Sequence, residues 1–98
     1  MKPSTKLSAA EIADRLKRLP GWRLENDAIV RDYPTDGWPT TLMLVNAIGF
    51  FAEAADHHPD IVINYKRVTL TYSTHSEGGL TEKDFDGALA AERQAAVR

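Results

Sequence analysis

The chain has 98 residues, of which 43% are hydrophobic, and its 12 basic and 14 acidic residues give a net charge of −2. This composition fits one compact globular domain, and it lacks the basic excess of a nucleic-acid-binding surface. The absence of cysteine excludes disulfides, thiolate catalysis and cysteine-ligated zinc. No apolar export segment follows the N-terminal residues, and no apolar run reaches the ~20 residues of a membrane span. We therefore expect a single cytoplasmic domain, residues 1–98, with neither nucleic acid nor membrane as a partner.

The first third of the chain predicts a helix followed by a hairpin. Ser8 and Glu11 form a capping-box pattern, so a helix should run from about residue 9 to residue 17. Pro20-Gly21 ends it. Two short apolar segments flank the turn candidate Asn26-Asp27 and are expected to form the first hairpin, namely residues 22–24 and 28–33.

A second helix should start between residues 36 and 39, with Asp36 as its cap, and continue to about Asp56. Pro59 prevents it from extending much further. Its apolar residues lie on two sides: one stripe consists of Leu44, Ala47, Ile48, Phe51 and Ala55, and the other of Met43, Phe50 and Ala54. A helix that is apolar nearly all round must be buried nearly all round. Either another helix of the same chain or a partner subunit could cover the second side, and we favour the partner subunit because the core is thin.

The second half predicts another hairpin and a last helix. Residues 61–65 and 68–74 read as strands, and the second of them alternates apolar and polar residues, so that one face packs on helices. Gly78-Gly79 form a turn, and Thr81 with Asp84 opens the last helix. The order α-β-β-α-β-β-α predicts an α+β fold, a four-stranded antiparallel sheet with three helices on one face.

All three histidines fall in one stretch, as His57, His58 and His75. Histidine is the side chain whose unperturbed pKa, ~6.5, lies closest to neutrality. Glu53 lies four residues before His57, on the same side of the expected helix, and Asp84 follows His75. This concentration of proton-transfer groups beside two carboxylates predicts a site that moves protons.

Each of these residues also has a purely structural interpretation. A histidine pair before a proline is commonly a polar helix end, where the helix dipole favours cations. A strand-terminal histidine can simply be solvated, Asp84 fits the N3 position of the last helix, and Tyr65 could be a hairpin aromatic. A metal site is disfavoured, because the sequence lacks the i, i+4 histidine pair that places two imidazoles on one helical face.

Taken together, the spacing resembles that of the pterin-4a-carbinolamine dehydratase family. The similarity extends from Pro20-Gly21-Trp22 to the last helix, and one departure is the Asp36–Thr40 stretch, which contains Gly37 and Pro39. The motif that carries the resemblance is Glu53-x-x-x-His57-His58-Pro59, then Tyr65, Ser73-Thr74-His75, Gly79-Leu80-Thr81 and Asp84.

The resemblance implies a dehydratase that eliminates water from a 4a-hydroxy-tetrahydropterin of the tetrahydrobiopterin type and gives the quinonoid dihydropterin. The reaction belongs to the recycling of the cofactor of aromatic amino-acid hydroxylases. By this resemblance, His57 and His75 transfer protons with help from Glu53, whereas His58, Asp84 and Tyr65 bind or support the substrate. Imidazoles can do both proton transfers near neutral pH, so no metal or organic cofactor is expected.

The resemblance also implies a homodimer or homotetramer, which would explain the apolar second side of the long helix. Some relatives act instead as binding proteins, either as a transcriptional cofactor or as a carboxylase assembly factor. A non-catalytic binding or assembly role on the same fold is therefore the alternative to the enzyme.

Overall fold

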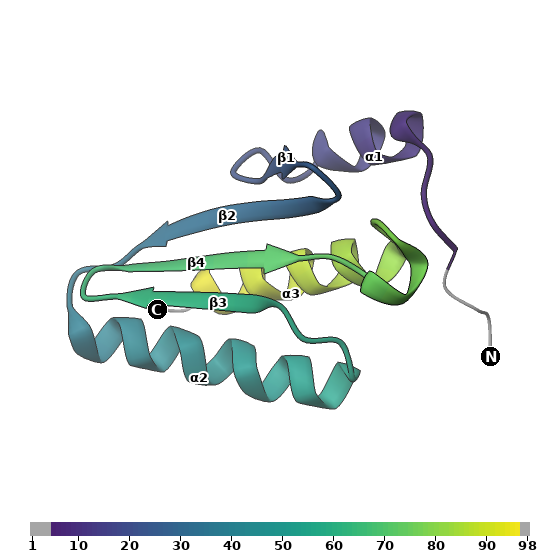
Figure 1. The fold of residues 1–98 in the computed structure, drawn as a ribbon. Coiled ribbons are helices and arrows are strands. Elements are labelled where there is room, and N and C mark those ends of the chain that lie inside the picture. The colour runs from purple at the N-terminus through teal and green to yellow at the C-terminus, as the bar shows by residue number, and fades with distance from the viewer. Residues whose placement is uncertain (1–4, 97–98) are drawn as a thin grey trace.

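The computed structural model describes residues 5–96 and confirms the expected α+β fold (Figure 1). Four antiparallel strands and three helices follow one another in the order α-β-β-α-β-β-α, with one added 3₁₀ turn before the last helix. In chain order they are α1 (Ala9–Leu16), β1 (Arg23–Glu25), β2 (Ala28–Pro34), α2 (Trp38–Ala55), β3 (Asp60–Asn64), β4 (Arg67–Tyr72), η1 (His75–Glu77) and α3 (Glu82–Ala96).

The sheet has the strand order β1-β2-β4-β3, so the two hairpins join through their inner strands. The β2–β4 pairing runs from Ile29 opposite Tyr72 to Pro34 opposite Arg67. Alternate residues of β4 are buried, as the period of two predicts. Apolar side chains of β2 and β4 therefore form one face of the sheet, and the other face is largely polar.

Helices α2 and α3 cover the apolar face and pack against each other (Figure 1). α1 lies beside the edge strand β1, and its residues Ile12 and Leu16 pack against the same core. The Ser8–Glu11 capping box is present, with reciprocal hydrogen bonds of 3.2 and 2.8 Å. The hydrogen bond from the Ser8 backbone N–H, and then that with the Ser8 side chain, also lower the pKa of Glu11.

The ends of α2 decide where the histidine pair lies. Gly37, not Asp36, occupies the N-cap position and makes no side-chain cap, so the expected Asp36 cap is wrong. At the other end, Asp56 adopts the left-handed conformation with φ 53°. This residue stops the helical winding and turns the chain before Pro59, so that His57 and His58 leave the helix in different directions.

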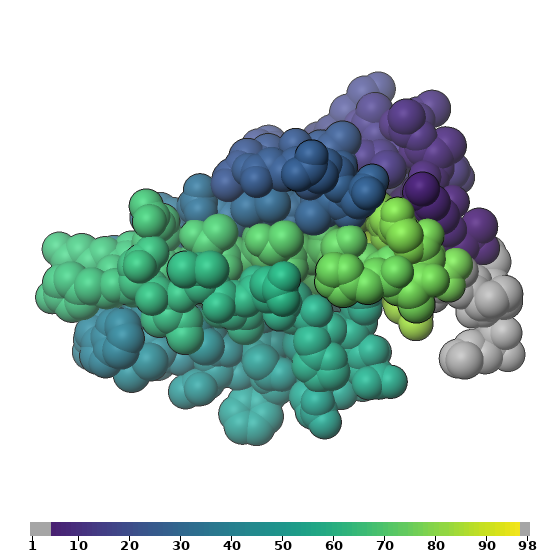
Figure 2. Space-filling model, in the orientation of Figure 1, coloured from purple at the N-terminus to yellow at the C-terminus, as the bar shows by residue number. Residues whose placement is uncertain are grey.

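The apolar second side of α2 is exposed in the single chain. Residues of the inner side, such as Leu44 and Ile48, are buried, whereas Phe50 is 79% and Met43 65% exposed. Figure 2 shows side chains of α2 projecting along the lower edge of the molecule. Across the part of the chain that the structure describes, no helix has the length and apolarity needed to cross a lipid bilayer.

This exposed apolar face leads to a prediction about assembly. We expect the protein to sediment as a dimer or tetramer at micromolar concentration, because a second copy would remove Phe50 and Met43 from water. Phe50→Asp or Met43→Asp should shift sedimentation towards smaller species without lowering the melting temperature of the single chain. Phe50→Leu, which keeps the site apolar, is the matched control. A wild-type chain that stays monomeric at all concentrations contradicts this prediction.

Candidate active site

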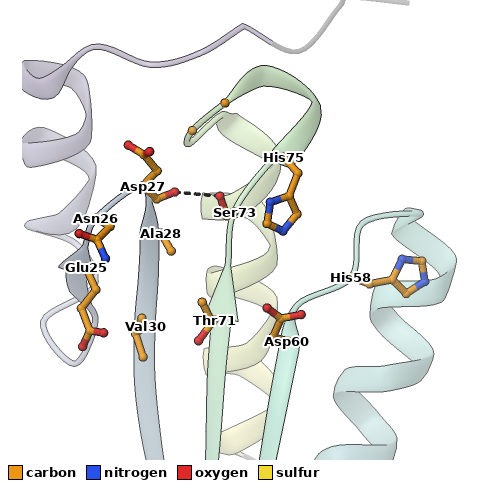
Figure 3. A pocket seen from close by; sticks show the side chains of 12 residues that line it. Glu25, Asn26, Asp27, Ala28, Val30, His58, Asp60, Thr71, Ser73 and His75 are labelled. Atoms are coloured by element: carbon orange, nitrogen blue, oxygen red, sulfur yellow. Dashed lines mark hydrogen bonds between the residues drawn. The ribbon is translucent and has the colours of Figure 1, made fainter.

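His58 and His75 line the same open cavity, which has a volume of about 430 Å³ (Figure 3). It lies over the ends of β2, β3 and β4 that are nearest η1, on the polar face of the sheet. Its size falls within the range of small-molecule sites. The complete lining consists of Glu25, Asn26, Asp27, Ala28, Val30, His58, Asp60, Thr71, Ser73, His75, Gly78 and Gly79.

His75 is the first residue of η1, directly after β4. A bridge between Thr74 and Gly79 closes this short loop and holds it against the end of the sheet. Figure 3 shows the His75 ring directed toward the cavity. Among the described residues no side-chain hydrogen-bond partner of His75 is found, so both ring nitrogens are available to a ligand or to water.

His58 belongs to the loop that connects α2 and β3. Its Nε2 lies 2.8 Å from Oε1 of Glu53, and both side chains are more than half exposed. In Figure 3 its ring is turned outward to α2, away from His75, although the residue forms part of the cavity wall. An exposed pair of this kind contributes little stability, so His58 can exchange Glu53 for a ligand at small cost.

His57 is held much more firmly and is not among the residues that line the cavity. Its Nε2 lies 2.7 Å from Oδ1 of Asp84, and its side chain is only 14% exposed. A carboxylate is a hydrogen-bond acceptor, so Nε2 carries the proton and Nδ1 is left as the basic nitrogen. The ring also stacks on Tyr72, with centroids 5.7 Å apart and an interplanar angle of 22°. The exposed part of His57 lines a separate cleft of about 100 Å³ between α2 and α3.

Asp84 is fully buried and accepts hydrogen bonds at both carboxylate oxygens. Oδ1 accepts from His57, and Oδ2 accepts from the Thr74 hydroxyl at 2.8 Å and from the Thr81 backbone N–H at 2.9 Å. The contact with the Thr81 N–H is the helix-capping contact expected of a residue at position N3. The Thr81 hydroxyl in turn accepts a hydrogen bond from the Lys83 N–H, as an N-cap side chain does. Asp84 therefore both caps α3 and fixes His57.

In the structure Glu53 contacts His58 and not His57, the residue with which it was predicted to share a helical face. Their i, i+4 spacing would place them on one helical face, but the left-handed Asp56 lies between them and ends the helix. Glu53 pairs with His58 instead, and Asp84 takes the place beside His57. The roles predicted for these residues in catalysis and binding stay predictions.

Tyr65 lies apart from the other predicted site residues within the single chain. It occupies the turn between β3 and β4, and its side chain is 64% exposed. His75 follows the opposite end of β4, so the length of the strand separates the two residues (Figure 1). Tyr65 is therefore not among the residues that line the cavity.

Sequence reasoning missed the polar wall that the β1–β2 turn contributes to the cavity. Asn26, in the left-handed conformation with φ 55°, and Asp27 were predicted only as a turn. The Ser73 hydroxyl donates to the Asp27 carbonyl oxygen at 2.8 Å and ties this turn to the end of β4. No local signal marks this wall, because the turn reaches the cavity only when β2 pairs with β4.

Within residues 5–96, no group of three or more His, Asp or Glu side chains is arranged to hold a metal ion.

Comparisons with known proteins agree with this fold. Residues 5–94 match the family described as pterin 4 alpha carbinolamine dehydratase. A protein of Chloroflexus aurantiacus, provisionally named pterin-4-alpha-carbinolamine dehydratase, is 54% identical over 86 residues, which cover 88% of this chain and 90% of the relative. One from Aquifex aeolicus with the same provisional name is 43% identical over 79 residues, covering 81% of this chain and 80% of that protein.

Two solved structures are also similar. A transcriptional coactivator/pterin dehydratase from Brucella melitensis has a TM-score of 0.90 at 32% identity and covers 93% of this chain and 99% of its own. A pterin dehydratase-like protein, identified as a RuBisCO assembly factor in the alpha-carboxysome, shares the fold with a TM-score of 0.63 at 16% identity, over 76% of this chain and 86% of its own. Given the match over residues 5–94 and the identity to these relatives, the chain belongs to the pterin 4 alpha carbinolamine dehydratase family.

Proposed function

We propose that the protein catalyses the elimination of water from a 4a-hydroxy-tetrahydropterin, giving the quinonoid dihydropterin. The observation that carries this proposal is the open cavity that His58 and His75 line, together with a third imidazole, His57, whose orientation a buried carboxylate fixes. The C4a–O bond breaks and the hydroxyl leaves as water with a proton from an acid, while the N5 proton passes to a base and its electron pair forms the C4a=N5 double bond. The substrate takes up one proton and releases one. Imidazoles can supply and accept these protons near neutral pH, and no redox partner is needed.

In this proposal His75 and His57 transfer the two protons. His75 faces the cavity and has both ring nitrogens available. His57 has its Nε2 proton fixed by Asp84, which orients the ring and leaves Nδ1 as the basic nitrogen. His58 would bind the pterin after its exposed contact with Glu53 opens.

The cavity wall suits the hydrogen-bonding pattern of a pterin. Carboxylates of Glu25, Asp27 and Asp60 line it and are hydrogen-bond acceptors, whereas the reduced pterin presents several ring and amino N–H donors. The hydroxyls of Thr71 and Ser73 can donate or accept beside them. These groups would orient the bicycle so that C4a and N5 lie next to imidazole nitrogens.

A second candidate function is a binding or assembly role. Its support is the exposed apolar side of α2, with Phe50 79% exposed, together with the coactivator name of the Brucella relative. This role uses the opposite side of the molecule from the cavity, so the two functions are compatible and can be tested separately.

A single assay tests the proposed reaction. A 4a-carbinolamine generated by an aromatic amino-acid hydroxylase is followed by its ultraviolet decay with and without purified protein. We expect acceleration proportional to the protein concentration, and we expect it to survive exhaustive chelation, because proton transfer by imidazoles needs no metal. Decay that the protein leaves unchanged would sink the proposal, and activity lost on chelation but restored by zinc would assign the reaction to a metal.

A further inference from the structure

Tyr72 is a buried aromatic residue that no part of the proposed reaction uses. It is the last residue of β4, its side chain is fully buried, and its ring stacks on His57 at 5.7 Å between centroids. Its hydroxyl is buried and, among the described residues, has no hydrogen-bond partner. A buried hydroxyl without a partner is unfavourable, so the value of a tyrosine here lies in its ring and not in its hydroxyl.

The ring also needs space that a neighbouring residue provides. Gly87 lies in the middle of α3 against Tyr72, and a Cβ added there would be 2.5 Å from Cζ of the tyrosine ring and 2.8 Å from its hydroxyl oxygen. Contacts this short force the ring to move. Glycine is less favourable than alanine in a helix interior, so at this position the sequence accepts a weaker helix and leaves the space that the Tyr72 ring occupies.

We propose that Tyr72 is a positioning residue for His57 and that Gly87 leaves the space for its ring. The Tyr72 ring fixes the plane of the imidazole, while Asp84 fixes its tautomer. This inference rests on the proposed function. A hydrogen bond at Nε2 alone leaves the ring free to tilt about the line from His57 to Asp84, and a flat stacked partner removes this freedom. The Nδ1 atom then points in one direction, as a group that accepts a substrate proton requires.

Tyr72 does not itself exchange protons in this arrangement. Burial, and to a smaller extent the nearby Asp84 carboxylate, raise the pKa of Tyr72 to about 12, so the phenol stays neutral at physiological pH. It acts on the reaction only through His57.

Two substitutions of Tyr72 separate the ring from the hydroxyl. Tyr72→Phe keeps the ring and removes the hydroxyl without a partner, so we expect turnover and stability close to wild type. Tyr72→Leu removes the stacked ring, and we expect kcat to fall about tenfold or more, with little change in KM. Leu70→Val is the matched control, since it loosens the core on the same face of β4 without touching His57 and should lower the melting temperature but not kcat.

Substitutions at position 87 test the same proposal by displacing the Tyr72 ring without replacing Tyr72. Gly87→Ala should push the Tyr72 ring away and lower kcat, although alanine is the better helix former. Gly49→Ala in α2, where an added Cβ meets nothing within 4 Å, is its control and should raise the melting temperature. In the double variant Tyr72→Leu with Gly87→Ala, the added methyl group fills part of the vacated space, so stability should recover while kcat stays low.

A readout besides activity separates this inference from the proposed function. In proton NMR, the Nε2 proton of His57 should appear as a protected downfield resonance in the wild type and in Tyr72→Phe, identified by its loss in His57→Ala. It should exchange with solvent in Tyr72→Leu and in Gly87→Ala. If the wild type fails to accelerate the reaction, the proposed function is wrong, yet the resonance still tests the positioning role.

Three results would overturn the inference. The first is a protected resonance and normal kcat in a folded Tyr72→Leu protein. The second is an equal loss of kcat in Tyr72→Phe, which would assign the effect to the hydroxyl. The third is recovery of kcat along with stability in the double variant, which would reduce Tyr72 to core packing. If Tyr72→Leu does not fold, Gly87→Ala decides between these outcomes on its own.

Discussion

Replacement of both His57 and His75 by alanine should bring the dehydration of a 4a-carbinolamine close to its uncatalysed rate. Loss of one positioned general acid or base typically costs ~10²–10⁴ in rate. Each single substitution should cost less here, because the carbinolamine also dehydrates in water and one imidazole can partly replace the other. Steady-state kinetics of the two single variants and the double variant, beside their melting curves, measure this effect.

His58→Ala is the matched comparison for this pair. His58 shares the cavity with His75 but makes only an exposed contact with Glu53, and its proposed role is binding. A group that binds ground and transition states equally changes KM without changing kcat, so His58→Ala should raise KM and leave kcat nearly intact. Near wild-type turnover in a folded His57→Ala, His75→Ala double variant would show that these histidines are not the proton-transfer groups.

Periodicity and capping patterns were sufficient to predict the fold. The Ser8–Glu11 box placed α1, and the alternation along β4 separated its buried face from its polar one. These signals are local, since each depends on residues two to four positions apart, and the antiparallel sheet follows from short hairpin connections. The sequence also indicated the apolar second side of α2. This helix is apolar nearly all round, and a single sheet can cover only one side of it.

The pairing inside the site was not predictable from the same local rules. The spacing of Glu53 and His57 indicated a helical contact, but one residue, Asp56 in the left-handed conformation, redirected the chain. Nothing in the sequence marks Asp56 as such a residue except its place before the His-His-Pro segment. The His57–Asp84 contact joins residues 27 positions apart, so only the packing of α2 on α3 determines it.

The stacking of Tyr72 on His57 was missed for a similar reason. The alternation along β4 identified Tyr72 as a buried residue, which is correct. It indicates only which face of the sheet Tyr72 lies on, and not which residue it contacts. The matching signal was Gly87 inside an otherwise strong helix, and an isolated helix glycine indicates close packing without naming the partner.

Asp84→Ala should destabilise the fold far more than loss of an exposed helix cap would. A cap alone is worth about 1 kcal/mol. Asp84, however, is fully buried and accepts hydrogen bonds from His57, Thr74 and Thr81, and its removal takes the acceptor from the His57 ring and from the buried Thr81 backbone N–H. We expect a loss of about 3 kcal/mol or more in the free energy of unfolding, measured by urea denaturation. Asp14→Asn, an exposed acid on α1, is the control and should change stability little.

Asp84→Asn separates the structural role of this residue from its effect on His57. The amide oxygen can still accept from Thr74 and Thr81, so much of the stability should remain. The amide nitrogen would then face Nε2 of His57, where a donor forces the imidazole into the other tautomer, with its proton on Nδ1. The nitrogen able to accept a proton would then be Nε2, which faces residue 84, and kcat should fall about tenfold or more. A stable Asp84→Asn protein with full turnover would instead confine Asp84 to capping α3, because the tautomer of His57 would then have no influence on the reaction.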